Sequence, residues 1–354
     1  MFTVSGETTL TIDTIGLMSA APKDCLFFDI ETTGFSPKTT ICYLIGAISY
    51  DDGMWRFHQW FAENIEDECN IIKQFLDLVS TKKYLIHFNG EGFDIPYIMS
   101  KCEKYDFPDV FSSINSIDLF KIISHHKKML KLENYKQKTI EKFLDVNRVD
   151  IYSGGDLINV YNEFLETGNR ELINALIIHN YEDILGLTAI LPAISYNQIR
   201  NHMYSFVNYD IEGQEIIFTF SLSVPLPKRV SMRHEDFYLT AYGNTLKLRV
   251  KIYTNELKYF YSNYKDYYYL PNEDMAIHKS VAFYVDKNFR TKAKAATCYS
   301  RKTGKFLPQL TEIFNPYFKI DYFDKIMYFE MVDEFLSSPE DITKYCNETI
   351  QYIL

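Results

Sequence analysis

The sequence predicts an α/β domain built on a mixed sheet, followed by a second domain that is mainly β. In the first half, short apolar strands come first and then alternate with helical segments, which is typical of a sheet with antiparallel strands on one side and helices on its faces. The 354 residues exceed the usual size of one domain, and the composition changes after Pro192. We therefore assign residues 24–195 to the first domain and 212–354 to the second, and interpret residues 1–23 as an irregular lead-in.

The composition is that of a globular protein without disulfides or membrane spans. Hydrophobic residues make up 47% of the chain and charged residues 24%, which is ordinary for a globular protein with a sizeable core. The six cysteines are scattered and form no CxxC pair, which argues against zinc and disulfides and indicates a reducing cytosol. We see no signal peptide, and no apolar run approaches the roughly 18 residues of a membrane span. We expect a cytoplasmic protein that does not enter the membrane.

The net charge of −10 is unevenly distributed. Residues 1–200 hold 18 Lys and Arg against 28 Asp and Glu, whereas residues 201–354 hold 19 of each. This acidic balance weakens any general affinity for nucleic acid, which rests on neutralising phosphates, although a local basic groove remains compatible with it.

The elements of the first domain follow from periodicity and turn signals. The Asp-Asp-Gly sequence at 51–53 predicts a hairpin between two buried strands. We expect strands at 25–28, 41–50, 54–61, 84–88 and 116–119, and helices at 66–79, 95–104, 138–144, 156–167 and 171–190.

The first motif is FDIETTG at 28–34, at the end of the first of these strands. Because a strand alternates faces, Asp29 and Glu31 project from the same side while Ile30 turns into the packing. Two adjacent carboxylates repel each other, and a divalent cation that prefers oxygen ligands would reverse the sign of that interaction. The alternative is a strand end that faces water, where two acids cost little.

The second motif, NGEGFD at 89–94, begins where a later strand ends. Its glycines allow an abrupt turn at the end of a strand, where ligand sites of α/β proteins usually form. Asp94 would then start the next helix, either as a functional acid or simply as a helix cap. We interpret Asp118, at the end of the 116–119 strand, as structural or as supporting the site.

The third motif lies in the helix predicted at 171–190. His179 and Asp183 are four residues apart and therefore share one face, one turn above the other. An ionisable pair on a mostly apolar helix is costly to bury unless it is satisfied. A mutual hydrogen bond between the two side chains is the simplest alternative to a functional role.

Together these motifs resemble those of the DEDD exonuclease superfamily, which has a ribonuclease-H-like fold of a mixed sheet flanked by helices. The order and spacing, with the Ile-Asp-Leu at 117–119, look most like the bacterial YprB-type ribonuclease-H-like proteins, and are also similar to the proofreading domain of B-family DNA polymerases. The resemblance covers residues 24–195. It implies a metal-dependent 3′–5′ exonuclease that hydrolyses DNA or RNA with two Mg²⁺ or Mn²⁺ ions.

The resemblance also implies a role for each acid. Asp29 would bridge the two ions, Glu31 and Asp183 would complete one metal site, and Asp94 would support the other. His179 would orient or deprotonate the attacking water, for which the ordinary pKa of histidine, about 6.5, is suitable.

The sequence departs from the family pattern at the general base. The tyrosine branch has a Tyr four residues before the last Asp, and the histidine branch a His five residues before it. Here His179 occupies the tyrosine spacing and Ile178 the other position. Tyr181 lies about 200° around the helix from Asp183 and cannot replace His179 from the same face.

The second domain reads mainly as strands. We expect a strand at 215–222, a hairpin of 236–241 and 245–253 across Gly243 and Asn244, and a helix at 272–285. Residues 245–252 alternate, with aliphatic side chains inward and basic ones outward. Residues 279–305 hold eight basic residues against the single acid Asp286, interleaved with aromatic ones.

Basic side chains interleaved with exposed aromatic ones can clamp phosphates and stack bases, although a merely solvated face is the common alternative. The expected partner is single-stranded or structured DNA or RNA, and the sequence indicates no protein partner. The residues predicted to bind nucleic acid are Thr32, Asn89, Phe93, Lys247, Arg249, Lys251, Arg290, Lys292 and Lys294.

Two other functions fit the sequence. One is a nucleic-acid-binding or scaffold protein whose nuclease fold no longer turns over, which the displaced His179 favours and the four intact acids oppose. The other is a structure-selective endonuclease, because ribonuclease-H-like sites also cut internally. The sequence does not distinguish DNA from RNA, the polarity of cleavage or the oligomeric state.

Overall fold

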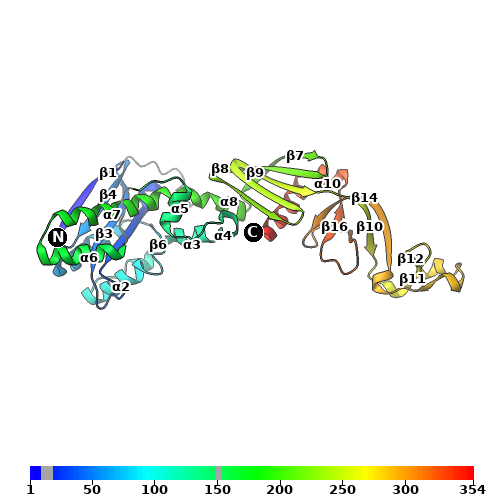
Figure 1. Cartoon of the computed structure of the whole chain (residues 1–354), viewed down its shortest axis with the longest axis horizontal. Helices are drawn as coiled ribbons and strands as arrows, with labels where there is room; N and C mark the ends of the chain where they lie inside the picture. The colour runs from blue at the N-terminus through cyan, green and yellow to red at the C-terminus, as the bar shows by residue number, and fades with distance from the viewer. Residues whose placement is uncertain (9–18, 149–153) are drawn as a thin grey trace. The chain divides into compact units, whose positions relative to one another are not determined.

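The computed structural model describes residues 1–8, 19–148 and 154–354, which divide into two compact units (Figure 1). The first unit is Met1–Asn197 and the second is Gln198–Leu354. The predicted domain limits, 24–195 and 212–354, remain predictions.

The first unit is built on a six-stranded mixed sheet with the strand order β1-β4-β3-β2-β5-β6. β2 is parallel to β5 and β5 to β6, whereas the other neighbours are antiparallel. This confirms the predicted α/β class with antiparallel strands on one side. The strands are β1 (Phe2–Thr8), β2 (Cys25–Thr32), β3 (Cys42–Asp51), β4 (Met54–Phe61), β5 (Tyr84–His87) and β6 (Asn115–Asp118). The helices are α1 (Glu68–Val79), α2 (Asp94–Tyr105), α3 (Leu119–Ser124), α4 (Lys127–Leu130), α5 (Gln137–Phe143), α6 (Gly154–Thr167), α7 (Glu171–Ala189) and α8 (Asn197–Arg200), the last of which crosses into the second unit.

The predicted hairpin between β3 and β4 is present. Asp51 pairs with Met54, and the two residues between them, Asp52 and Gly53, have φ of 52° and 86°. Two consecutive positive φ values are what a tight hairpin requires, so the Asp-Gly sequence determines this turn.

The interpretation of residues 1–23 as an irregular lead-in is wrong for the first eight. Phe2–Thr8 forms β1, which pairs along its whole length with β4 at the edge of the sheet. Its side chains are exposed or half-buried, so the strand lacks the apolar signal by which a buried strand is recognised. Residues 9–18 lie outside the described part of the chain.

Helices cover both faces of this sheet. Phe28 of β2 stacks on Phe75 of α1, with ring centroids 5.1 Å apart. The next residue, Asp29, points to the other face, where its carboxylate meets Asn180 of α7. α6 runs beside α7 (Figure 1) and contributes Tyr161 and Phe164 to the core against Phe61 of β4. The alternation in β2 thus places Asp29 under α7.

The second unit consists mainly of antiparallel strands, in agreement with the predicted class. Its strands form sheets with the orders β7-β8-β9, β10-β14-β16-β15 and β12-β11-β13. α11 packs on the first of these, where Tyr345 meets Phe218 of β8. The strands are β7 (Tyr204–Glu212), β8 (Glu215–His234), β9 (Phe237–Lys251), β10 (Tyr253–Phe260), β11 (Tyr267–Leu270), β12 (Met275–His278), β13 (Thr291–Lys292), β14 (Tyr299–Gln309), β15 (Tyr317–Phe318) and β16 (Met327–Glu330). The helices are α9 (Lys279–Ala282), α10 (Asp333–Leu336) and α11 (Pro339–Ile353).

The predicted hairpin across Gly243 and Asn244 is wrong. β9 is one strand from Phe237 to Lys251, and it pairs on both sides of Gly243 with the long strand β8. Gly243 has φ of 53° and pairs with Leu226 where the register shifts. β8 advances four residues from Leu226 to Val230 while β9 advances two, from Gly243 to Ala241, so the extra residues lie in β8 and β9 continues through Gly243 without reversing.

The helix predicted at 272–285 is also largely absent. Residues 275–278 form β12 instead, and only Lys279–Ala282 is helical. Asp274 has φ of 48°, which a helix does not allow, and its carboxylate accepts hydrogen bonds from the Tyr269 and Tyr299 hydroxyls, each at 2.5 Å. These tertiary contacts override the local helical pattern.

Within the described residues, no helix combines the length and the apolar character that crossing a membrane requires.

Candidate active site

The end of β2 places two acids on one face of the sheet. Asp29 and Glu31 are separated by Ile30, which is buried on the opposite side. Asp29 pairs across the sheet with Gly46 of β3, and the register shifts just after Glu31. The regular pairing of β2 with β3 therefore ends immediately after Glu31.

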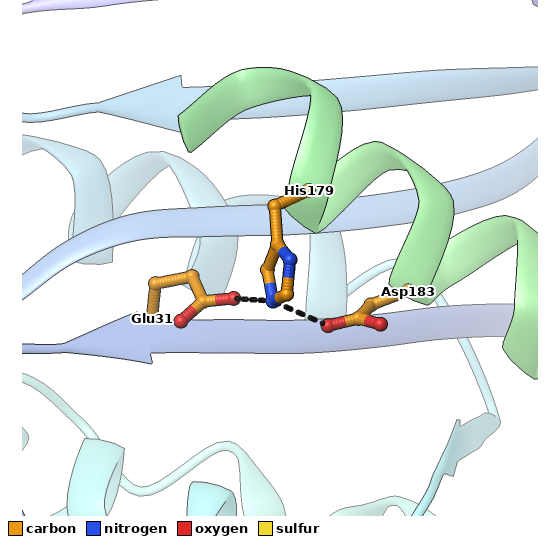
Figure 2. A group of neighbouring side chains, drawn as sticks. All are labelled: Glu31, His179 and Asp183. Atoms are coloured by element: carbon orange, nitrogen blue, oxygen red, sulfur yellow. Dashed lines mark ion pairs between the residues drawn. The ribbon is translucent and has the colours of Figure 1, made fainter. Parts of the chain in front are cut away.

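α7 brings the third motif over these acids. The Nε2 atom of His179 lies 3.1 Å from Oδ2 of Asp183 and 3.6 Å from Oε1 of Glu31, as Figure 2 shows. One ligand atom from each of these three residues lies within 4.8 Å of the other two. His179 and Asp183 therefore share one face of α7, as their spacing of four residues predicts, and both side chains lie above the end of β2.

Asn180 and Gly46 determine how closely α7 approaches β2. Nδ2 of Asn180 donates to Oδ2 of Asp29 at 3.2 Å, and Gln59 of β4 donates to Oδ1 of Asn180 at 3.0 Å. A Cβ atom at Gly46 would overlap Asn180 and Ile184. Asn180 was not identified from the sequence, although a polar residue beside His179 on a largely apolar helix is a signal that could have revealed it.

Asp94 enters from the turn after β5. Asn89, with φ of 61°, starts a compact turn in which the Gly92 amide donates to the Asn89 carbonyl at 3.0 Å. Asp94 is the first residue of α2 and is 7% exposed. Its carboxylate accepts hydrogen bonds from its own amide and from that of Ile30, which places it beside β2. Both predicted features of Asp94, the helix start and the proximity to the first motif, are therefore present.

Asp118 supports this turn. Its Oδ1 atom accepts hydrogen bonds from the Asn89 amide at 2.9 Å and from the Phe120 amide at 3.0 Å. It thus caps α3 and holds the start of the NGEGFD turn, in agreement with its predicted structural role.

The four acids crowd one another electrostatically. Burial raises the pKa of Asp29 well above its ordinary range, and the charges of Asp94, Asp183 and Glu31 raise it further. Burial likewise raises the pKa of Asp94 to about 7, against the opposing effect of its two backbone hydrogen bonds. Carboxylates from three distant segments therefore meet at one place and oppose one another's ionisation.

Asp183 is the exception, because Arg148 and His179 both contact its carboxylate. Burial works to raise its pKa, but the hydrogen bond from His179 and the charge of Arg148 outweigh burial and lower it. Nη1 of Arg148 contacts Oδ1 of Asp183, while Nε and Nη2 hold the carboxylate of Glu141 on α5. Neither Arg148 nor Glu141 was identified from the sequence, since no spacing rule links a residue of the loop after α5 to α7.

Tyr181 does not take part in the site. Its ring lies against Phe57 of β4, with centroids 4.9 Å apart. This placement agrees with the helical-period argument that Tyr181 cannot replace His179. Ile178, the residue at the spacing of the histidine branch, is 51% exposed.

The predicted nucleic-acid contacts in the first unit border this site. The Thr32 hydroxyl donates to the Gly34 carbonyl at 3.0 Å, and the Phe93 ring lies next to that of Phe35, with centroids 5.9 Å apart. Phe35 is 90% exposed. An aromatic pair thus stands beside the turn that supplies Asp94.

The predicted contacts in the second unit differ in their surroundings. On β9, Arg249 is paired with Glu212 at 3.1 Å and with Glu215 at 2.7 Å, and Lys251 lies 3.9 Å from Asp236. These acids favour the solvated-face alternative for Arg249 and Lys251, while Lys247 is exposed.

The basic residues near 290 also differ from one another. The Arg290 guanidinium lies 4.9 Å from the centroid of the Tyr268 ring and donates to the Ala282 carbonyl, which gives it a structural role. Lys292 and Lys294 are exposed. These two side chains therefore retain the accessibility that a phosphate contact requires.

Fold and site together define a ribonuclease-H-like α/β domain with a carboxylate cluster. Residues 26–195, slightly less than half of the chain, match the family model described as the RNase_H superfamily. This match agrees with the sheet topology and with the predicted fold class. It does not distinguish the YprB-type branch.

Viral DNA polymerases are among the relatives. The chain is 25% identical over 185 residues to the DNA polymerase of Autographa californica nuclear polyhedrosis virus, covering 41% of this chain and 18% of that protein. It is 25% identical over 126 residues to the DNA polymerase of Bombyx mori nuclear polyhedrosis virus, covering 27% of this chain and 13% of that protein. The chain thus spans less than a fifth of the length of these relatives.

Two solved structures are similar at a low level. The family B DNA polymerase of Pyrobaculum calidifontis has a TM-score of 0.38 and 14% identity, over 68% of this chain and 35% of that one. The E. coli ExoI–ssDNA complex has a TM-score of 0.31 and 11% identity, over 61% of this chain and 54% of that one.

We expect the burial of Asp94 to make the stability of the metal-free protein depend on pH. The pKa of Asp94 is raised, so between its ordinary value and about 7 the folded state holds a proton that the unfolded state has lost. The free energy of unfolding contributed by Asp94 therefore falls as pH rises through this window. Asp94→Asn, which cannot ionise, should be more stable than the wild type by a few kcal/mol at pH 8, on the order of 1.4 kcal/mol per pKa unit, and by much less at pH 4.

Urea unfolding with chelator at several pH values measures this difference. Asp77→Asn is the matched control, because it removes an exposed carboxylate of α1. A stability difference between wild type and Asp94→Asn that is the same at pH 4 and pH 8 would contradict the electrostatic account.

Proposed function

We propose that this chain is a metal-dependent nuclease that hydrolyses phosphodiester bonds of DNA or RNA, acting as a 3′–5′ exonuclease. The observation that carries the proposal is a group of acids from three segments. Glu31 and Asp183 offer ligand atoms that lie with one of His179 within 4.8 Å of one another, and the charges of Glu31, Asp94 and Asp183 all act on Asp29. The match of residues 26–195 to the RNase_H superfamily supports it. The 3′–5′ polarity rests on the motif resemblance alone.

The donor set suits one or two divalent cations such as Mg²⁺ or Mn²⁺. Hard cations take carboxylate oxygens, and Asp29, whose pKa is raised by burial and by the charges of Asp94, Asp183 and Glu31, offers such an oxygen beside further acids. Asp29, Glu31 and Asp183 would hold one ion, and Asp29 with Asp94 would hold the other. When bound, such ions activate water and stabilise the leaving oxygen of a phosphodiester.

The side chains of the protein then have distinct tasks. Asn180 fixes the rotamer of Asp29 through its hydrogen bond to Oδ2. His179 projects between Glu31 and Asp183 and can hold a proton at Nε2 at the edge of the cluster. We propose His179 as the general base. Its contacts to two carboxylates also fit a metal ligand or a satisfied His–Asp pair, which experiment can separate.

Aromatic side chains in both units support a single-stranded substrate. Phe35 and Phe93 border the site in the first unit. In the second unit one segment, which we call the aromatic tip, holds three exposed aromatic residues at 76%, 86% and 55% exposure: Phe283, Tyr284 and Phe289. Exposed Lys287, Lys292 and Lys294 belong to the same segment. Rings stack on bases and lysines pair with phosphates, so both parts suit an unpaired strand.

The first test is cleavage by the purified chain of end-labelled single- and double-stranded DNA and RNA, with Mg²⁺, Mn²⁺ or chelator. We expect a ladder that shortens from the 3′ end and disappears with chelator. Asp29→Asn should abolish cleavage, because it removes the carboxylate at the centre of the cluster, and should raise the melting temperature of the metal-free protein.

The alternatives predict other results. Internal cuts in a branched or hairpin substrate would favour a structure-selective endonuclease. Tight binding of nucleic acid without cleavage under any metal condition would instead favour a nucleic-acid-binding protein that has lost its activity. A fall in the apo melting temperature of Asp29→Asn would contradict the repulsion argument.

His179→Ala tests the general base. If His179 accepts a proton, turnover should fall by about 10²–10⁴-fold and the affinity for Mn²⁺ should change little. The rise of activity with pH that the wild type owes to the imidazole should be lost, and His179→Tyr should recover part of the rate. A variant that loses affinity for Mn²⁺ would identify His179 as a metal ligand. Unchanged turnover would show that the residue only packs the helix.

Replacing two rings of the aromatic tip tests the substrate contact. Phe283→Ala with Tyr284→Ala should weaken binding of single-stranded oligonucleotide by about 5- to 100-fold, since stacking contributes roughly 1–3 kcal/mol per base. Fluorescence anisotropy measures the affinity. Phe323→Ala is the matched control, because that ring is 83% exposed elsewhere in the second unit. Equal affinities of wild type and double variant would exclude the tip from substrate binding.

A further inference from the structure

Arg148 joins the carboxylate cluster to a second acid. Its guanidinium holds both oxygens of Glu141 through Nε and Nη2 and contacts Oδ1 of Asp183 through Nη1. The Arg148 side chain is 10% exposed and that of Glu141 is 2% exposed. Arginine has a planar guanidinium that can donate hydrogen bonds to two carboxylates at once, which lysine cannot do with the same geometry.

Neighbouring residues are arranged around this contact. Nε2 of Gln137 donates to Oε1 of Glu141 at 2.9 Å and to the backbone carbonyl of Asp183 at 2.8 Å. A Cβ atom at Gly186 would overlap Glu141 and lie 2.8 Å from Nη2 of Arg148. The absence of a side chain at Gly186, one turn after Asp183, thus leaves room for the ion pair.

The consequence for Asp183 is that both of its oxygens are engaged. Oδ1 meets Arg148, and Oδ2 lies 3.1 Å from Nε2 of His179. A divalent cation that uses Asp183 must share the carboxylate with the guanidinium or displace one of these partners. The divalent cation would also be repelled by the positive charge of Arg148, which is in direct contact with the Asp183 carboxylate.

We propose that Arg148 is the resident counter-cation of Asp183, anchored by Glu141, and that it lowers the affinity of the site for a divalent cation. This inference rests on the proposed function, because it concerns the metal that the nuclease would use. Arg148 is a positioning residue here. It acts on the metal through Asp183, and Glu141 acts through Arg148.

The proposal predicts effects of opposite sign for two residues in the same ion pair. Arg148→Gln removes the competing positive charge, so Mn²⁺ should bind about tenfold more tightly. Glu141→Gln removes the anion that shares the guanidinium, so Arg148 should neutralise Asp183 more fully and Mn²⁺ should bind several-fold more weakly. Arg148→Lys keeps the charge but loses the planar fork, so its affinity for Mn²⁺ should lie between those of the wild type and Arg148→Gln. A purely structural role for the pair would make both Gln variants bind Mn²⁺ more weakly.

Calorimetric titration of the full chain with Mn²⁺ provides the readout. Thermal melts in chelator and in Mn²⁺ provide a second one, since the metal should raise the melting temperature of Arg148→Gln more than that of the wild type. Arg249→Gln is the matched control, because it removes an arginine that also bridges two glutamates but lies in the other unit. It should leave Mn²⁺ affinity unchanged.

Arg148→Gln leaves the carboxylate of Glu141 buried without a cation, which destabilises the folded protein. The double variant with Glu141→Gln removes both charges and restores folding. Because the nearer charge is the positive one, the double variant should bind Mn²⁺ at least as tightly as the wild type. Weaker binding by both Arg148→Gln and the double variant overturns the inference. A wild-type chain that binds no Mn²⁺ at all would instead count against the proposed function itself.

Discussion

The mutual repulsion of the buried carboxylates is the constraint on which the rest of the site depends. Asp29 lies where the fields of Glu31, Asp94 and Asp183 overlap, and burial increases the cost of ionising it. The chain compensates with neutral and cationic partners at the edges. These are the amide of Asn180 on Asp29, the backbone amide of Ile30 on Asp94, and Arg148 with His179 on Asp183.

Two glycines make this compensation geometrically possible. Gly46 lets Asn180 approach β2, and Gly186 lets Glu141 and Arg148 approach α7. In both places a polar side chain occupies the space that a Cβ atom would take. Asn180 lies at Gly46 and contacts Asp29, whereas Arg148 lies at Gly186 with Glu141 and contacts Asp183. The packing of α7 against the sheet and the electrostatics of the site are thus determined by the same contacts. A substitution that disturbs the packing at Gly46 or Gly186 would also move a charge.

The sequence was sufficient where the chemistry follows from local spacing. The two-residue period of β2 and the four-residue step in α7 bring Asp29, Glu31, His179 and Asp183 to one place. The sequence did not reveal the roles of Asn180, Glu141 and Arg148, because these roles depend on contacts between segments that are distant in the sequence. The same limit explains the second unit, where pairing with a long neighbour keeps β9 continuous through Gly243, and tyrosine hydroxyls hold Asp274 in a non-helical conformation.

The charge of the first unit bears on how it would meet a polyanion. Several of its cations are already committed to internal acids: Lys101 is buried against Glu68 at 2.7 Å, and Arg148 against Glu141 and Asp183. If the chain is the proposed nuclease, bound metal would therefore have two effects. It would relieve the repulsion within the carboxylate cluster, and it would supply positive charge where the scissile phosphate must sit. Substrate affinity at this site should then depend on the metal, whereas stacking on exposed rings should not.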